Sequence, residues 1–395
     1  MLSDELRRWT KRNLPRLNSQ VSQGLLSPDK MVEIAQPHLT HLYQQLWTQA
    51  KIENLGVSEA RRLIQLLGFI ISSSEKHFQT QGYARGTGIK RLQYAEKLCG
   101  VLATIAGHPP RDTAYTYWIW NASAQALTFT DNPQELLFNQ VVNRSDELFA
   151  KTCNQLRHMC YGDVQISSQK ACEIISHAAS NILEAKSQYV SLMAYADDTR
   201  SRRNLEPSFF MKEFRTYLAT YPVNGKTWGG VSAANIASQM QLDYLLGTVD
   251  DNYTAHVMHR LGYLPKEYIR ELKDDMMLPS IVDLILKQLN LTQVEVLRSD
   301  SADLKKSIQF HHSQLATTLQ AYKQVIKAIS SLTTFHWTLI KNYLTKPSLQ
   351  MAKAEKESLN VNPDVGTGGM SMEDVKGVRD MRRQHPVITK LVACV

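Results

Sequence analysis

Apolar side chains recur at intervals of three and four residues along most of the chain, which is the spacing of helices that bury one face. The stretch from Ser58 to about Thr80 is a clear case, with Leu63, Leu66 and Ile70 on a common face. Runs of alternating apolar and polar residues are nearly absent, and no glycine-rich nucleotide-binding fingerprint follows a strand pattern. The predicted fold is therefore all-α, without alternating strands and helices.

Start and stop signals divide this pattern into separate helices. A first helix within residues 1–26 is expected to break near Pro15, and Ser27-Pro28-Asp29 opens a second helix that ends near Ile52. This second helix bends or restarts at Pro37. Further helices are expected at 89–106, 133–160, 167–195, 206–222, 233–246, 266–276, 279–289, 303–344 (as one helix or two) and after the capping residue Ser371.

The stretch Asp112–Asp131 interrupts the helical pattern. Its aromatic and β-branched residues favour a short hairpin or an aromatic connector. It ends near the boundary that we expect between a smaller N-terminal helical part, residues 1–125, and a larger helical domain, residues 126–395. Whether the smaller part folds by itself stays open, because a sequence defines such boundaries only loosely.

Composition excludes several classes of protein. The 395 residues carry 45 Lys and Arg against 37 Asp and Glu, and 43% are hydrophobic, which suffices for one large core or two smaller ones. The net charge is +8, but basic residues are spread along the chain and interleaved with acidic ones, so we expect no nucleic-acid partner. Five cysteines without a CxxC pair predict neither a disulfide framework nor a zinc site.

Two features predict a cytoplasmic protein without a membrane partner. The N-terminus is charged from residue 4 onward, which does not fit a signal peptide. The longest apolar run, near Leu66–Ile71, is too short to cross a bilayer. A homo-oligomer is compatible with the sequence, which does not decide the matter.

His336 lies in the apolar stripe of the helix expected over 321–344, and Val325, Ile329 and Leu339 share its face. Its imidazole therefore needs a partner, which is either a hydrogen bond inside the core or a haem iron. The loop Gly366-Thr367-Gly368-Gly369 follows after a polar run. Such a loop is either merely flexible or a lid that closes over a ligand, with Thr367 supplying a hydroxyl.

Arg215 lies in an apolar helical segment beside Phe209 and Phe210. A buried guanidinium needs a negative partner, which is either an acid or a helix C-terminus of the protein, or a substrate carboxylate held by a bidentate clamp. The stretch Gly229-Gly230-Val231-Ser232-Ala233 allows close approach to a flat ligand, although glycines before a helix are common. Asp243, among leucines, is either a solvent-facing residue or a buried carboxylate that orients a ligating histidine.

These segments occur in a definite order along the chain: PSFFMKEFRTYL, then GG with VSA, then QLDYLLG, then AYKQVIKAISSLTTFHWTLIKNYL and GTGG. In this order, over about residues 206–380, the chain resembles the C-terminal half of indoleamine 2,3-dioxygenase, in the tryptophan dioxygenase superfamily. The haem enzyme of pyrrolnitrin biosynthesis, monodechloroaminopyrrolnitrin synthase, has a similar pattern. The resemblance implies a large multi-helix haem-binding domain of the indoleamine dioxygenase type.

On the cofactor side, the resemblance implies that His336 is the proximal ligand of the iron in haem b. Asp243 matches the acid that is linked to this histidine. Gly230 belongs to the glycine pair, and Ser232 and Ala233 match the two residues that follow it at the edge of the haem.

On the substrate side, Arg215 matches the arginine that holds the substrate carboxylate. Phe210 matches the phenylalanine over the substrate ring, with Phe209 as the alternative because the pair lies one residue out of register. Thr367 matches the threonine of the mobile loop. The distal serine or histidine of the related enzymes has no clear counterpart, and 138–143 is where it would lie.

The function that the resemblance implies is a haem-dependent oxygenase of tryptophan or a related indolic or aromatic amino acid, with dioxygen as co-substrate. Both oxygen atoms would enter across the indole C2–C3 bond, with no need for a protein base. Two alternatives stay open. One is a ring-rearranging haem enzyme like that of the pyrrolnitrin pathway, and the other is a haem- or small-molecule-binding protein without turnover.

Overall fold

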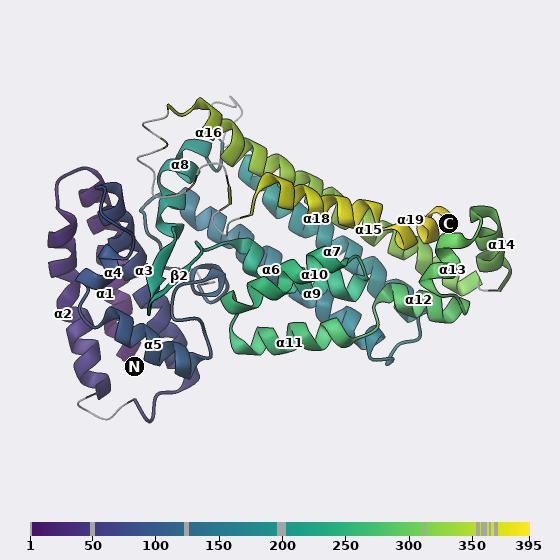
Figure 1. The fold of residues 1–395 in the computed structure, drawn as a ribbon, viewed down its shortest axis with the longest axis horizontal. Helices are drawn as coiled ribbons and strands as arrows, with labels where there is room; N and C mark the ends of the chain where they lie inside the picture. The colour runs from purple at the N-terminus through teal and green to yellow at the C-terminus, as the bar shows by residue number, and fades with distance from the viewer. Residues whose placement is uncertain are drawn as a thin grey trace.

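The computed structural model describes residues 2–47, 52–121, 126–195, 203–311, 313–352, 356, 362, 365–366 and 370–395. Within these residues the regular structure is helical apart from one two-stranded hairpin, which confirms the all-α prediction. The molecule is elongated, with the N-terminal helices at one end (Figure 1). At the other end lie α12 (Ile281–Leu289), α13 (Gln293–Arg298) and α14 (Ser301–His311).

The N-terminal end is built from α1 (Leu2–Ser22), α2 (Pro28–Trp47), α3 (Val57–Thr80), α4 (Thr87–Arg91) and α5 (Ala95–Ala106). The prediction of a break at Pro15 is wrong, because α1 continues through this residue. Leu14 and Leu17 on either side of it are buried, and α1 packs against α3. This packing outweighs the hydrogen bond that the proline removes. The helix α2 continues through Pro37, so it does not restart there, and the bend that was the alternative stays a prediction.

Three long helices run along the body of the molecule: α6 (Pro133–Cys160), α7 (Gln169–Met193) and α15 (Ser313–Ile340). The helix α7 packs against both others, and α18 (Met372–Gln384) packs against α15 (Figure 1). The remaining elements are η1 (Tyr115–Ile119), α8 (Pro207–Lys212), η2 (Phe214–Leu218), η3 (Ala233–Asn235), α9 (Ala237–Leu246), α10 (Asp251–Arg260), η4 (Leu261–Tyr263), α11 (Lys266–Met277), η5 (Lys341–Thr345), α16 (Lys346–Gln350) and α19 (Pro386–Ala393).

The single helix expected over 206–222 is instead the short α8, the tight 3-10 turn η2 and the first strand of a hairpin. The strands β1 (Tyr221–Val223) and β2 (Lys226–Trp228) pair antiparallel, with Tyr221 opposite Trp228. The turn residues Asn224 and Gly225 have φ of 51° and 74°, the left-handed pair that a tight hairpin turn needs. The predicted helix therefore ends at Lys212, and Arg215 lies in the 3-10 turn.

Two further expectations about local structure have definite outcomes. The aromatic stretch after Asp112 is a connector that contains the buried π-helical turn η1, not a hairpin. Ser371 caps α18, and Asp374 completes the expected capping box.

The buried apolar residues form three clusters. The first joins the N-terminal helices to residues between 192 and 236, and the second lies mainly between α6, α7, α12 and α15. The third is a small cluster that includes α9 and α11. The first cluster contains residues from both sides of residue 125. It therefore does not separate the smaller N-terminal part from the larger domain, and the domain boundary near residue 125 stays a prediction.

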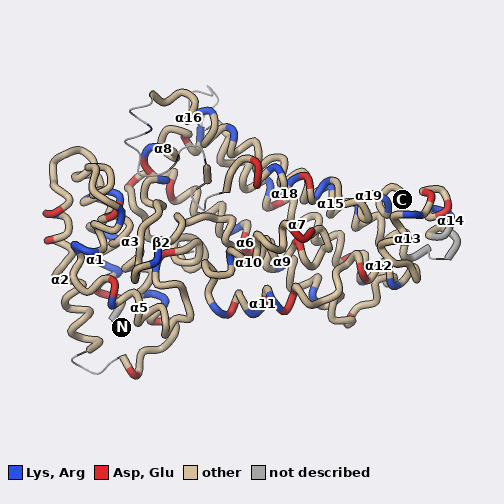
Figure 2. The backbone as a smooth tube through the Cα atoms, in the orientation of Figure 1, with Lys and Arg blue, Asp and Glu red and all other residues tan. Residues whose placement is uncertain are grey.

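No helix in the described part of the chain is long and apolar enough to cross a membrane. Basic and acidic residues are interspersed on outer helices such as α11 (Figure 2). The absence of a nucleic-acid partner stays a prediction. The cytoplasmic location stays a prediction.

Candidate functional site

A cavity of about 250 Å³ lies where the three apolar clusters meet. Its walls come from α6, α9, α10, α15, α18 and from the stretch 205–234. Five residues selected from the sequence line it: Phe210, Arg215, Ser232, Ala233 and His336. Segments separated by more than 100 residues in the chain therefore meet around one space.

Three other selected residues do not line this cavity among the described residues. Gly230 is buried two residues before the lining residue Ser232, and Asp243 is buried outside the lining. Thr367 lies outside the described residues, although Gly366 before it is part of the lining.

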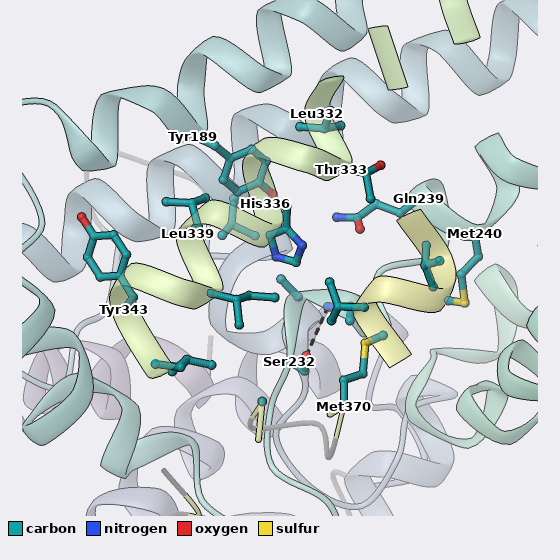
Figure 3. A pocket seen from close by; sticks show the side chains of 18 of the residues that line it. Tyr189, Ser232, Gln239, Met240, Leu332, Thr333, His336, Leu339, Tyr343 and Met370 are labelled. Atoms are coloured by element: carbon teal, nitrogen blue, oxygen red, sulfur yellow. Dashed lines mark hydrogen bonds between the residues drawn. The ribbon is translucent and has the colours of Figure 1, made fainter. Parts of the chain in front are cut away.

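His336 projects from α15 into the cavity (Figure 3). Protein surrounds His336 on all sides. Its side chain is nevertheless accessible to solvent, because the ring faces the interior of the cavity. No described residue forms a hydrogen bond with either ring nitrogen, so His336 is not a hydrogen-bonded core histidine. Burial, together with the charge of Arg382, lowers the pKa of His336 to about 4. The ring is therefore neutral near pH 7, with a lone pair for a ligand.

Asp243 is fully buried and is not the solvent-facing residue that the sequence left open. Arg382 donates to both of its carboxylate oxygens, from Nε at 2.8 Å and from Nη2 at 2.6 Å. Tyr253 donates to the same carboxylate at 2.7 Å and Thr248 at 3.0 Å. Nη1 of Arg382 also donates to the hydroxyl of Thr333 at 2.8 Å.

Asp243 therefore reaches the helix of His336 through Arg382, because Thr333 is one turn before the histidine on α15. Although burial disfavours its charge, the neighbouring carboxylate raises the pKa of Arg382. The sequence contained no signal for this arginine, since MRRQ at the end of a helix is typical of a solvated surface.

Arg215 is buried in the cavity wall. Its Nη2 donates to the main-chain carbonyls of Asn362, at 2.8 Å, and Val365. Its Nη1 contacts the sulfur of Met211 at 3.4 Å. The guanidinium thus joins the cavity wall to the segment that leads to Gly366.

Phe210 lines the cavity and Phe209 does not. The ring of Phe210 lies 5.5 Å from that of Phe138 and 5.9 Å from that of Tyr343. Phe209 is buried and stacks on Phe214 at 6.3 Å. The geometry therefore favours Phe210 of the two phenylalanines, and Phe138 from the region 138–143 is part of the same aromatic wall.

The glycine pair is held in place from two sides. Arg111 donates to the carbonyl of Gly229 at 2.9 Å, and the N–H of Gly229 donates to the hydroxyl of Tyr263 at 3.0 Å. Ser232 accepts the N–H of Ala234 at 3.3 Å and thereby caps η3. These contacts fix the short stretch that brings Ser232 and Ala233 to the cavity. Figure 3 shows Ser232 at its edge.

The structure adds lining residues that sequence reasoning missed. Gln239 and Met240 on α9 and Met370 before α18 border the space that His336 faces (Figure 3). His256 and Arg260 on α10 also line it. Among the described lining residues three are arginines and none is Asp or Glu.

A comparison with curated proteins finds no match. The family model described as Monodechloroaminopyrrolnitrin synthase PrnB matches residues 29–385, from the start of α2 to just after α18. This family is a member of the haem superfamily that includes indoleamine and tryptophan dioxygenases, which confirms the resemblance seen in the sequence. Because the match spans most of its length, the chain belongs to the monodechloroaminopyrrolnitrin synthase PrnB family.

Proposed function

We propose that this protein is a haem-dependent oxygenase that acts on tryptophan or a related indolic or aromatic amino acid. The observation that carries the proposal is the imidazole of His336. It is neutral, has no hydrogen bond to a described residue and faces an apolar cavity. Its neighbours in the lining, Phe210 and Arg215, are the residue types that an aromatic ring and a carboxylate require.

The residues present fit a haem. Iron in a porphyrin already has four nitrogen ligands and needs one imidazole from the protein. The described residues contain no group of three His, Cys, Asp or Glu that could hold a bare metal ion. The lining is mainly aliphatic and aromatic, as the faces of a macrocycle require. His336 would ligate the iron, Ser232 and Ala233 would border the ring, and the bound haem would supply the oxygen chemistry.

Phe210 would fix the plane of the substrate ring, because Phe138 and Tyr343 hold its own ring from two sides. Arg215 would hold the carboxylate of the amino acid. The Nη2 group of Arg215 donates to the carbonyls of Asn362 and Val365. A carboxylate that binds the same N–H groups would therefore compete with these carbonyls and change how Arg215 holds the segment before Gly366. Binding of substrate would thereby bring the loop with Thr367 over the cavity and exclude water.

In this reaction both atoms of dioxygen enter across the indole C2–C3 bond, which breaks, and the product is of the N-formylkynurenine type. No protein carboxylate is needed to remove a proton. This requirement agrees with the absence of Asp and Glu from the described lining of the cavity.

The family match favours a second candidate, a haem enzyme that rearranges the ring system as in the pyrrolnitrin pathway. The same cofactor ligand and the same aromatic wall serve both reactions. The residues around the substrate ring would decide between them.

Absorption spectra test the proposal. The purified protein should show a Soret band, and His336→Ala should lose it while its far-ultraviolet circular dichroism is unchanged. An unchanged band in the variant would remove His336 from the assignment. Addition of L-tryptophan and ascorbate in air should then yield an N-formylkynurenine-type absorption. A substrate-induced Soret shift with another indole, but no product from tryptophan, favours the ring-rearranging candidate.

A further inference from the structure

Arg260 is a buried cation in the cavity wall that the proposed reaction does not use. It is 7% exposed and lines the cavity from the end of α10. One N–H group donates to the carbonyl of Ala234 at 2.6 Å, which leaves most of its five donors without a described protein acceptor. It forms no ion pair with a described residue.

A buried charge without a counter-charge is costly for a folded chain. The charge of Asp374 acts on Arg260 without forming an ion pair, and its carboxylate accepts the N–H and the hydroxyl of Ser371, at 2.8 Å and 2.9 Å. Burial therefore dominates and lowers the pKa of Arg260. The chain by itself does not compensate this cation fully.

His256 lies one helical turn before Arg260, on the same face of α10. It also lines the cavity, and its Nε2 is buried with no hydrogen-bond partner in the described part of the chain. Two neighbouring polar side chains therefore open onto one cavity: among the described residues, Arg260 has only the carbonyl of Ala234 as an acceptor, and Nε2 of His256 has no partner. An anion from outside the chain would satisfy both.

The other two arginines of the lining have different surroundings. Arg382 is neutralised by the carboxylate of Asp243. Arg215 lies beside the aromatic wall of Phe210 and donates to loop carbonyls. Arg260 alone of the three has neither an ion pair nor a loop contact among the described residues.

We propose that Arg260 and His256 form the seat for the carboxylate groups of the macrocycle that His336 ligates. This inference rests on the proposed function. Haem b carries its two carboxylates on one edge, so the seat orients that edge toward α10 and the first turn of α18, where Ser371 also lines the cavity. The remaining edges then face the apolar wall. Arg260 and His256 bind the cofactor and take no part in the reaction.

Titration of the haem-free full-length protein with haem b and with its dimethyl ester tests the seat, because the ester lacks the two negative charges. The change in Soret absorbance gives each dissociation constant. Arg260→Gln should raise the dissociation constant of haem b about thirtyfold, because one buried charge pair is lost. It should change the dissociation constant of the ester by no more than about threefold. His256→Gln should show the same selectivity with a smaller loss, because it removes a neutral hydrogen-bonding group.

Arg270→Gln is the matched control, since it removes the same charge from an exposed position on α11. It should bind both macrocycles as the unchanged protein does. A substrate carboxylate is the other possible occupant of the seat. If Arg260→Gln weakens the tryptophan-induced Soret shift and leaves the affinity for haem b intact, the assignment to the macrocycle is overturned.

The outcomes separate the two proposals. Unchanged affinity of Arg260→Gln for haem b overturns the seat and leaves the haem protein standing, whereas failure of the unchanged protein to bind either macrocycle overturns both. If Arg260→Gln binds neither haem b nor the ester, that variant is misfolded. The two single variants Arg260→Lys and His256→Gln then test the seat. Here the seat predicts that Arg260→Lys keeps most of the preference for haem b over the ester and that His256→Gln loses part of it. An undiminished preference in His256→Gln contradicts the seat.

Discussion

Two histidines enclosed by protein, one buried and one facing the cavity, show how the N-terminal core differs from the cavity. His108 uses both ring nitrogens: Nδ1 bonds the carbonyl of Pro109 at 2.8 Å and Nε2 bonds the hydroxyl of Thr113 at 2.9 Å. His336 has no such bond among the described residues. Burial is the main cause that lowers the pKa of both, to about 3 and about 4, so both rings are neutral.

Two buried arginines repeat this contrast. Arg111 pairs with Asp112 at 2.8 Å, donates to the carbonyl of Gly229 and lies over the ring of Tyr221. Arg260 has a single carbonyl. A polar group that the chain itself satisfies maintains the fold, and one that it leaves open points to a ligand.

The largest expected difference is between His336→Ala and His108→Ala. The first should abolish the Soret band and leave the haem-free protein almost as stable as before, because no hydrogen bond to a described residue is lost. The second should keep the band and lower the free energy of unfolding by about 1–3 kcal/mol, because Thr113 and Pro109 lose their partner. Absorption spectra and urea unfolding measure the two effects. Equal loss of haem in both variants would contradict the contrast.

The arginine pair should differ next. Arg111→Met leaves the carboxylate of Asp112 buried and unpaired, which should lower the free energy of unfolding by about 3–5 kcal/mol. Arg260→Met removes a cation that the chain does not fully compensate, so the haem-free protein should change by no more than about 1 kcal/mol. Urea unfolding of the haem-free proteins compares them. A large loss in Arg260→Met would mean that this arginine also maintains the fold.

Arg215→Ala sharpens the description of the cavity. It should weaken ligands that carry a carboxylate by about 2–5 kcal/mol and barely affect plain indole, because only the former use the guanidinium. Titration of the Soret shift with tryptophan and with indole measures both. Equal weakening of both ligands would rule out the clamp and leave Arg215 as an anchor of the loop through Asn362 and Val365.

The smallest expected effect is a pH dependence on the N-terminal side of the cavity. Burial raises the pKa of Glu135 to about 7, although the N–H groups of Phe129 and Thr130 bond its carboxylate. Between about pH 4.5 and 7 the folded protein thus binds more protons here than the unfolded chain does, so this residue destabilises the fold progressively as the pH rises.

Between about pH 4.5 and 7, the free energy of unfolding should fall by about 1–3 kcal/mol less in Glu135→Gln than in the unchanged protein. Urea unfolding at a series of pH values checks it. The same slope in both proteins would mean that the carboxyl group titrates normally.

Much of the helical framework was predictable from the sequence because caps and apolar spacing act locally. The capping box at Ser371 and the helix over Val57–Thr80 are examples. Prediction failed where packing or strand pairing overrode the pattern. The helix α1 continues through Pro15 because α3 packs beside it. The helix expected over 206–222 is divided into α8, η2 and the strand β1, which pairs with β2.

The sequence by itself determined the all-α class, the ordered motifs that place the chain in its family, and five residues that line the cavity. These depend on local spacing and on residue types that are unusual in their setting. Only the tertiary structure decided that Arg382 reaches Asp243 from 139 residues away and that Arg260 is left with a single carbonyl. Partners of buried charges come from distant segments, and no local pattern specifies which segments will meet.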